Sequence, residues 1–327
     1  MPFDAVVTIS EVFVLAAARV RAALGLPGAS PGEVLPFRDK LLMKRLVAAG
    51  GFRVPEHAAF TSWEPAAALL ARHGRVVVKP RDGAGAVGVH VVSAEPDLRA
   101  LFDELGADGG YEVEEHVPGP MYQLDALRVA GTTVLDSAAG YTGVVADHAS
   151  LPRAGSLTLP PGPLLDRLLA FNRGVLDAMG HVTGVTHMEV FLTPDGEIVF
   201  CEVAARPGGL GTAALVGRTR GLDLIEADLR LQLGLPLFEP RPTAALGGIA
   251  VIAGTGRRVA HLPDPAVAEQ DWVVRARVRP RVLGEVAARP DDVAQQACQY
   301  VFVADDPEQQ RERLHWLWEH GGLGYAD

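Results

Sequence analysis

The apolar positions of the chain fall into longer stretches with helical spacing and shorter stretches with strand-like runs. Clusters of glycine, proline and aspartate stand between them, as is typical of the ends of helices and strands. The longer stretches predict helices over about residues 11–24, 37–49, 65–72, 96–105 and 222–233, and two closing helices that follow residues 290–292 and 305–307. The shorter stretches predict strands over about residues 4–9, 76–78, 87–92, 111–117, 121–128, 188–192, 198–203, 244–253 and 273–278. This order predicts an α/β (α+β) protein. A length of 327 residues predicts two or three lobes.

The strongest hairpin signal lies in residues 188–192 and 198–203, because a Pro-Asp-Gly sequence at 194–196 separates the two apolar runs. Each run carries one acid where a strand prefers an aliphatic residue, Glu189 in the first and Glu202 in the second. If the Asp-Gly pair forms a two-residue loop, the two acids face one another directly. A three-residue loop with a bulge at the glycine would slip the pairing by one residue. A shared carboxylate face would then need a second bulge or a longer loop.

Directly opposed carboxylates in a sheet lie about 5 Å apart and repel one another unless something positive lies between them. A hard divalent cation with oxygen ligands is the natural candidate for that charge. Arg206 follows Glu202 by four residues and precedes a Pro-Gly-Gly turn. Its planar guanidinium group suits a phosphate on the far side of such a metal. The alternative is that both glutamates lie on a solvated strand face.

Three glycines, Gly83, Gly85 and Gly88, match a G-x-G-x-x-G pattern whose meaning depends on what surrounds it. A dinucleotide-binding fold would continue from the glycines into a helix, whereas a β-rich run follows them here. Lys79 stands near the end of the preceding valine-rich strand. The pattern therefore predicts a strand–loop–strand flap over phosphates, with Lys79 as the point charge at its base. The alternative is a flexible hairpin without a ligand.

Two other strands leave their roles open. The run over residues 111–117 contains three glutamates and ends at a Pro-Gly turn, which fits either an edge strand or a linker that hydrogen-bonds a planar base. Arginine recurs at every second position from 275 to 281. One face of that strand is therefore basic, which indicates either a solvated edge strand protected by charge or a surface that recognises an anionic substrate.

The bulk composition narrows the class of protein. A chain of 327 residues, 48% of them hydrophobic, can bury a sizeable core. Its formal net charge of −10 argues against general binding to nucleic acid or to anionic membranes. The two cysteines, Cys201 and Cys298, form no disulfide framework and indicate buried thiols in a reducing compartment. No basic residue precedes the first short apolar run and no run reaches transmembrane length, so the sequence predicts a cytoplasmic protein.

The basic residues are almost all of one type. Of the 30 lysines and arginines, only Lys40, Lys44 and Lys79 are lysine, and the other 27 are arginine. Where a chain uses arginine almost everywhere, a remaining lysine is a candidate for a position that arginine cannot fill.

Five motifs in a fixed order resemble the ATP-grasp superfamily, and most of all its carboxylate–amine ligases, which join amino acids or small peptides. The motifs are residues 38–40 (RDK), 78–80 (VKP) with the glycine loop at 83–88, 113–119 (VEEHVPG), 187–189 (HME) and 202–209 (EVAARPGG). The resemblance covers roughly residues 3 to 325. It implies an ATP-grasp fold with a small flap lobe and a larger mixed-sheet lobe. The expected parts are residues 1–48 (the remnant of an N-terminal domain and a linking helix), 49–112 (the flap lobe) and 113–327 (the large lobe with a C-terminal extension).

The resemblance also implies roles for single residues. Lys40 and Lys79 are expected at the phosphates of ATP, under the loop that contains Gly83, Gly85 and Gly88. Glu114 and the backbone of residues 115–117, which includes Glu115 and Val117, are expected to hold the adenine. Glu189 and Glu202 are expected to bind magnesium, or manganese in its place. Arg206, together with Lys79, is expected to be catalytic through its grip on the transferred phosphoryl group.

Three features depart from the family pattern. Many members have asparagine two residues after the second metal-binding glutamate, where this chain has Ala204; the dipeptide-forming ligases share the E-x-A-A-R pattern seen here. The acid that usually binds ribose is replaced by Met121, which leaves Tyr122, Gln123 or Asp125 to take its place. Only the last β–α step of the family's N-terminal Rossmann-like domain, residues 4–24, is recognisable. Either a partner chain completes that domain, or the start is truncated, or the enzyme is a reduced form.

The resemblance implies an ATP-dependent ligase that activates a carboxylate as an acyl phosphate and then joins it to an amine. The expected partners are small-molecule carboxylate and amine substrates and a second copy in a homodimer, without nucleic acid or membrane. Two alternatives are a small-molecule kinase on the same scaffold and a catalytically weak ATP-binding subunit, which Ala204 and the short N-terminus would favour.

Overall fold

The computed structural model describes residues 3–142, 153–279, 283–286 and 296–326. Within them it contains two main antiparallel sheets and a two-stranded ribbon. The predicted helix after residues 290–292 and the arginine at 281 lie outside the described residues. No helix in the described part of the chain is long and apolar enough to cross a membrane.

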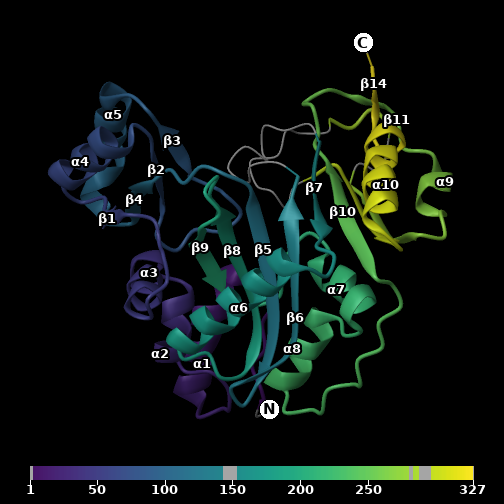
Figure 1. Ribbon diagram of the computed structural model, residues 1–327, viewed down its shortest axis with the longest axis horizontal. Helices are drawn as coiled ribbons and strands as arrows, with labels where there is room; N and C mark the ends of the chain where they lie inside the picture. The colour runs from purple at the N-terminus through teal and green to yellow at the C-terminus, as the bar shows by residue number, and fades with distance from the viewer. Residues whose placement is uncertain (1–2, 143–152, 280–282, 287–295, 327) are drawn as a thin grey trace.

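The small lobe is a four-stranded sheet in the order β1-β4-β2-β3, with helices packed on one face (Figure 1). Because side chains alternate along a strand, one face carries the fully buried Val76, Val78 and Val113, and the other carries Lys79 with its neighbouring acids. Phe60 and Leu98 complete the apolar core of this lobe. Its elements are β1 (His57–Ala59), α4 (Trp63–His73), β2 (Val76–Pro80), β3 (His90–Val92), α5 (Glu95–Leu105), the 3-10 turn η3 (Gly106–Asp108) and β4 (Tyr111–Glu115).

The large lobe is an eight-stranded sheet in the order β12-β13-β10-β7-β6-β5-β8-β9. All seven neighbouring pairs are antiparallel. Its strands are β5 (Met121–Val129), β6 (Thr132–Tyr141), β7 (Arg153–Thr158), β8 (Gly184–Leu192), β9 (Ile198–Ala204), β10 (Leu246–Ile252), β12 (Val273–Val278) and β13 (Cys298–Ala304).

Helices cover both faces of the large sheet (Figure 1). On one face, α3 (Lys40–Ala49) and α6 (Pro163–Ala178) pack over β5, β8 and β9, and α10 (Pro307–His320) packs over β10 and β13. On the other, α7 (Thr212–Arg220) and α8 (Leu224–Gln232) pack against β5, β6 and β8. Val185 packs with α7 and α8, so by alternation the side chains of His187 and Glu189 point to that same face further along β8.

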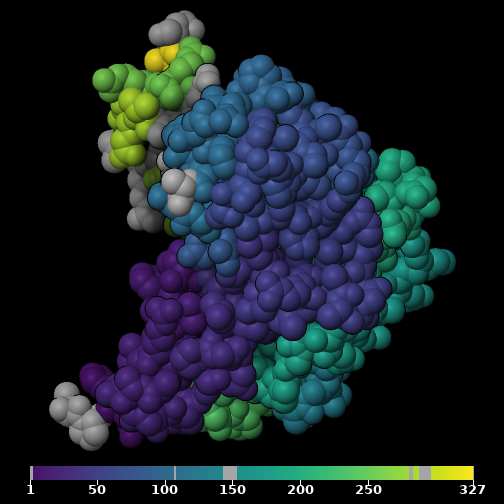
Figure 2. Space-filling model, turned by 90° about the vertical axis from the view of Figure 1, so that its left-hand side faces the viewer, coloured from purple at the N-terminus to yellow at the C-terminus, as the bar shows by residue number. Residues whose placement is uncertain are grey.

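The N-terminal segment packs beside the small lobe and over the large one, as Figure 2 shows in purple below the blue lobe. It contains the 3-10 turn η1 (Glu11–Phe13), α1 (Val14–Leu24), the short α2 (Pro31–Val34) and the 3-10 turn η2 (Leu35–Phe37). The C-terminal region adds β11 (Val259–His261), α9 (Pro265–Ala268) and β14 (Gly324–Tyr325).

The prediction of a strand over residues 4–9 is wrong. This segment has no strand partner, and side chains take up its backbone hydrogen bonds instead. The amide of Gln232 both accepts from the N–H and donates to the carbonyl of Thr8, and Arg21 donates to the carbonyl of Val6.

The predicted fold class is confirmed, with differences in detail. The large sheet is antiparallel in every pair rather than mixed, and α6 and α7 are not among the helices predicted from the sequence. Strand β12 is an edge strand with Arg275 and Arg277 exposed, which favours the solvated-edge interpretation of the alternating arginines. The division at residue 112 falls inside β4 and stays a proposal.

Candidate functional site

The hairpin of β8 and β9 places Glu189 directly opposite Glu202. Its loop is the three-residue form, because Leu192 pairs with Ile198 and Gly196 adopts a φ of 88°. That loop slips the register by one residue, and a bulge then restores it, since Val190 pairs with Phe200 and leaves the residue before Glu202 unpaired. The second of the two registers considered for this hairpin, with its required extra bulge, is the one that forms.

The two acids have different partners. The Lys40 ammonium lies 3.0 Å from Glu202, and the Tyr141 hydroxyl donates a 2.7 Å hydrogen bond to Glu189. The enclosed position of Glu202 would raise its pKa, but the charges of Lys40, Lys79 and Arg206 lower that pKa to about 2. Burial and the facing charge of Glu202 raise the pKa of Glu189. Glu189 therefore repels Glu202, and the His187 ring, whose Nε2 lies 3.9 Å from Glu189, offsets that repulsion only in part.

A buried ionic cluster lies above this hairpin, where β2 and β4 pair. Lys44 from α3 is 0% exposed and forms ion pairs with both Glu112 and Glu114. The Lys79 ammonium lies 2.7 Å from Glu114 and 3.8 Å from Glu112. Burial opposes the charge of Lys79, but the surrounding negative groups outweigh it and raise its pKa well above the ordinary value. Lys79 was expected at the phosphates, and the structure shows that it also pairs with the buried Glu114.

The glycine loop has the predicted strand–loop–strand form and no helix follows it. It begins with Gly83, whose carbonyl accepts a 2.9 Å hydrogen bond from the Lys40 ammonium. Gly85 and Gly88 adopt φ values of 67° and 71°, a region in which side chains other than glycine are strained. The loop therefore needs glycine at positions 85 and 88 for its shape, and Lys40 connects the loop to Glu202.

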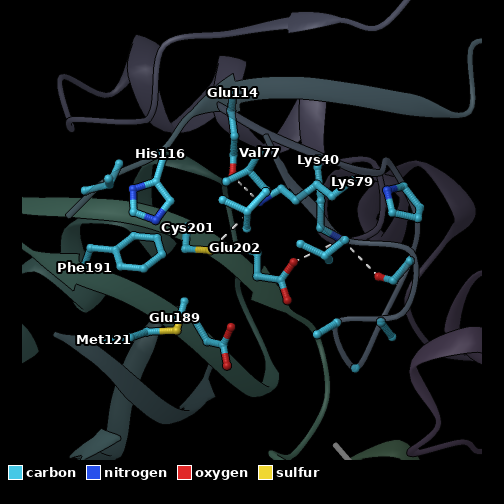
Figure 3. Close-up of a pocket in the computed structure, with 18 of the residues that line it drawn as sticks. Lys40, Val77, Lys79, Glu114, His116, Met121, Glu189, Phe191, Cys201 and Glu202 are labelled. Atoms are coloured by element: carbon cyan, nitrogen blue, oxygen red, sulfur yellow. Dashed lines mark hydrogen bonds and ion pairs between the residues drawn. The ribbon is translucent and has the colours of Figure 1, made fainter. Parts of the chain in front are cut away.

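The cavity between the two lobes, here called the interlobe cleft, brings most of the predicted residues together (Figure 3). Figure 3 shows Lys40, Lys79, Glu114, Glu189 and Glu202 around one space. The predicted residues that line this cleft are Lys40, Lys79, Gly83, Gly85, Glu114, Glu115, Val117, Glu189 and Glu202. Gly88 is not among the lining residues, although both of its neighbours are.

Two residues of the cleft differ from the roles expected for them. Glu114 is held by Lys44 and Lys79, and Glu115 pairs with Arg53 and accepts a hydrogen bond from the N–H of Glu56. The carboxylates of Glu114 and Glu115 are therefore engaged in ion pairs. This leaves the backbone of residues 115–117 to face a ligand. Met121, at the position where the resemblance led us to expect a ribose-binding acid, lines the cleft. Of its suggested substitutes, Gln123 lines a different cavity and Asp125 pairs with His187.

Arg206 does not line the interlobe cleft but lies beyond Glu189 and Glu202, where the N-terminal segment holds it. Its Nε atom donates a 2.7 Å hydrogen bond to Glu11. Glu11 also forms an ion pair with Arg38, which in turn donates to the carbonyl of Asp82 at the start of the glycine loop. The contacts thus connect Arg206 through Glu11 to the flap.

A second cavity of about 460 Å³, here called the second chamber, opens on that side. It shares Glu189, Glu202 and residues 84–86 of the glycine loop with the interlobe cleft. Arg206 lines the second chamber but not the cleft. The opposed carboxylates therefore stand where the two cavities meet.

Sequence reasoning did not assign three of these functional contacts. Tyr141 reaches Glu189 from β6, Glu11 reaches Arg206 from the N-terminal segment, and Lys44 lies between the buried acids. For Lys44 the signal was present, because it is one of three lysines among 30 basic residues. All three lysines pair with acids of the site: Lys40 with Glu202, and Lys44 and Lys79 with Glu114. Tyr141 and Glu11 carry no comparable mark in the sequence.

The residues fit a divalent cation beside a polyanion. Glu189 and Glu202 offer carboxylate oxygens from facing strands, which is the ligand type of a hard cation. A cation there would relieve the repulsion that raises the pKa of Glu189. Lys40, Lys79 and Arg206 add positive charge on both sides of the pair, which suits a bound phosphate chain.

No family model matches the chain, but several curated proteins are similar to it in sequence. The chain is 22% identical over 240 residues to the L-arginine-specific L-amino acid ligase of Bacillus subtilis, a match that covers 71% of this chain and 58% of that protein. It is 28% identical over 306 residues to the N5-carboxyaminoimidazole ribonucleotide synthase of Mycobacterium bovis, which covers 89% of this chain and 68% of the relative. The chain therefore spans less than two thirds of the length of the first of these relatives.

A solved structure shares the fold. The L-amino acid ligase from Bacillus licheniformis aligns with 100% of this chain and 82% of its own, with a TM-score of 0.81 and 21% sequence identity. This similarity confirms the predicted architecture of a flap lobe on a larger sheet lobe.

Proposed function

We propose that this chain, which belongs to the ATP-grasp superfamily, is an ATP-dependent ligase that joins a carboxylate to an amine. An amino acid or a small peptide is the proposed substrate. ATP would bind in the interlobe cleft, and the carboxylate to be activated would bind in the second chamber.

One observation carries the proposal: the opposed Glu189 and Glu202 stand where the two cavities meet, with Arg206 on the second side. A nucleotide in the cleft would extend its terminal phosphate toward these acids. A carboxylate in the second chamber would approach the same phosphate from the opposite side. Holding both reactants in this way replaces an unfavourable encounter in solution by an oriented one.

The residue roles are proposed as follows. Lys40 and Lys79 would neutralise the phosphates, with Gly83, Gly85 and Gly88 shaping the loop above them. Glu189 and Glu202 would hold magnesium or manganese, which supplies positive charge to the phosphates when it is bound. Lys79 and Arg206 would be catalytic. The adenine would lie against the 115–117 backbone, with Glu114 and Glu115 beside it.

The proposed reaction has two steps, and neither forms a covalent bond between the enzyme and the substrate. An oxygen of the substrate carboxylate attacks the γ-phosphorus of ATP, and the bond from that phosphorus to the β-phosphate oxygen breaks, which gives ADP and an acyl phosphate. The amine then attacks the acyl carbon, phosphate leaves with the electrons of the C–O bond, and the amine loses a proton. Arg206, which lines the second chamber, would hold the phosphoryl group as its charge shifts between these steps.

Carboxylate-dependent release of ADP tests this proposal. ADP is expected to accumulate only when the added substrate carries a free carboxylate, and full turnover is expected to need an amine as well. The measurement is a coupled ADP assay with amino acids added singly and in pairs, and with each acid's amide as the matched control. Equal ADP release with the amides would contradict the proposal.

Glu189→Gln is expected to raise the thermal midpoint of the metal-free protein by about 2 °C, because it removes a repelling charge worth up to about 1 kcal/mol. The new amide still accepts the hydrogen bond of Tyr141. Magnesium is expected to raise the midpoint of the wild type but not that of the variant, since only a competent site gains stability from its ligand.

Glu197→Gln is the control for this experiment, because Glu197 lies at the same hairpin loop but is half exposed. It is expected to keep the response of the wild type. A magnesium-induced shift of the same size in Glu189→Gln would refute the metal assignment.

Two further expectations remain proposals. A cytoplasmic location agrees with Cys201 and Cys298 both being free and buried. A homodimer is the proposed assembly, and sedimentation velocity of the purified chain tests it.

A further inference from the structure

The second chamber differs in character between its two ends. One end holds the acids Glu189 and Glu202 and Arg206. The other end is built by aliphatic side chains from β10 and from the segment after β9. These are Ile249, Val251 and Leu210, which pack in one cluster.

Strand pairing fixes the order of side chains between these ends. Tyr141 of β6 pairs with Ser156 of β7, and Ser156 pairs with Ile249 of β10. The three residues therefore form one row across the sheet, and all three line the chamber. Tyr141, at one end of the row, reaches Glu189 through its hydroxyl group. The row leads from the reacting end to the aliphatic end.

The aliphatic end belongs to a packed core. Ile249 and Val251 are 2% and 3% exposed and pack with Ala154, Leu215 and Val301. Their positions are thus fixed by neighbours on three elements, and they form a preformed wall.

The charged groups that line the chamber are engaged elsewhere. Among the described lining residues the carboxylates are Glu11, Glu189 and Glu202. Glu11 pairs with two arginines and Glu202 with Lys40, and Glu189 is proposed to bind a metal. The basic lining residues Arg206 and His187 are likewise paired, with Glu11 and Asp125. A charged side chain at the aliphatic end would therefore lose its hydration without gaining a free partner of opposite charge among the lining residues that the structure describes.

We propose that the carboxylate donor is an amino acid with an uncharged, apolar side chain, and that this side chain lies against Ile249 and Val251. The inference rests on the proposed ligase function and adds a substrate class to it. With its carboxylate at the junction of the two cavities, the donor would direct its side chain along the row toward β10.

A panel of donors tests the class. Leucine, valine and methionine are expected to support ADP release with kcat/KM at least about 10-fold above arginine, lysine, glutamate and aspartate, because each apolar group buried in the pocket contributes about that factor. Equal or better use of a charged donor would overturn the inference.

Ile249→Ala locates the specificity. Removing part of the wall is expected to lower kcat/KM for leucine by about 10-fold, mainly through KM, while alanine as donor changes by less than about 2-fold. Ile252→Ala is the matched control, since Ile252 lies on the same strand but packs with the opposite core of Tyr300 and Leu317. It is expected to leave the ratio of leucine to alanine unchanged.

The outcomes separate this inference from the function on which it rests. If no donor in the panel supports ADP release, the result would count against the ligase proposal. Donor-dependent release with a charged preference, or an equal change of the leucine-to-alanine ratio in Ile249→Ala and Ile252→Ala, would leave the ligase standing and reject the substrate class.

Discussion

Lys79→Ala is expected to lower ATP-dependent turnover by about 10²–10³-fold, the usual effect of losing one preorganised electrostatic contact to a reacting group. Lys79 lines the interlobe cleft, and its charge is secured by the acids around it. The variant is expected to stay folded but to lose stability, because Lys44 still pairs with Glu112 and Glu114 while the two buried acids then share one ammonium group. Steady-state ADP release measures the loss of turnover, and isothermal titration with ATP measures whether ATP affinity falls with it.

Lys79→Arg is expected to be impaired as well, since a planar guanidinium group is larger than the ammonium group that this buried position holds. Arg72→Ala is the control, because Arg72 belongs to the same lobe, is exposed, and pairs with Glu56. ATP affinity and turnover unchanged in Lys79→Ala would refute the flap assignment.

Lys44→Met is expected to have the largest effect on stability, about 3–5 kcal/mol, because removing one partner of a buried ion pair leaves the other charge uncompensated. Lys44 is 0% exposed, and so is Glu112. The expected result is a lower urea midpoint with an unchanged slope, or failure to fold.

A second variant keeps this prediction testable if the first does not fold. Lys44→Met combined with Glu112→Gln removes a charge from each side of the pair and is expected to recover part of the loss. A Lys44→Met protein as stable as the wild type would show that the cluster does not need this cation.

The hairpin shows how far local sequence reasoning reaches. The Pro-Asp-Gly sequence at 194–196 permits two loops, and each gives a definite register. The position of the two acids required either the shorter loop or an added bulge, and the structure has the bulge. Which loop forms depends on packing over the whole of β9, where Phe200 and Val203 enter the core on α6. The loop sequence alone does not determine it.

The lysines show a different kind of success. Their rarity marked Lys40, Lys44 and Lys79 without indicating what they contact. Their partners come from β4 and β9, which are far away in the sequence and meet the lysines only after the lobes fold. The same reason hid Glu11, which contacts Arg206 across 195 residues.

The segment over residues 4–9 shows where local strand propensity fails. An apolar run such as residues 4–9 has strand propensity, but it becomes a strand only where another backbone pairs with it, and here Gln232 and Arg21 meet it instead. The direction of the large sheet's strands is likewise a property of the connections between them. The family resemblance gave the architecture but not these details.

Trapping with hydroxylamine distinguishes a ligase from a kinase and from a binding subunit. The protein is incubated with ATP, magnesium, one amino acid as carboxylate donor and hydroxylamine, without any other amine, and ADP and hydroxamate are both measured. Activation of the carboxylate as an acyl phosphate predicts hydroxamate in an amount that matches the ADP, and no hydroxamate when the donor is replaced by its amide. ADP formation with the phosphate retained on a hydroxyl group and no hydroxamate would instead identify a kinase, and the absence of both products would identify a binding subunit; either result would contradict the ligase.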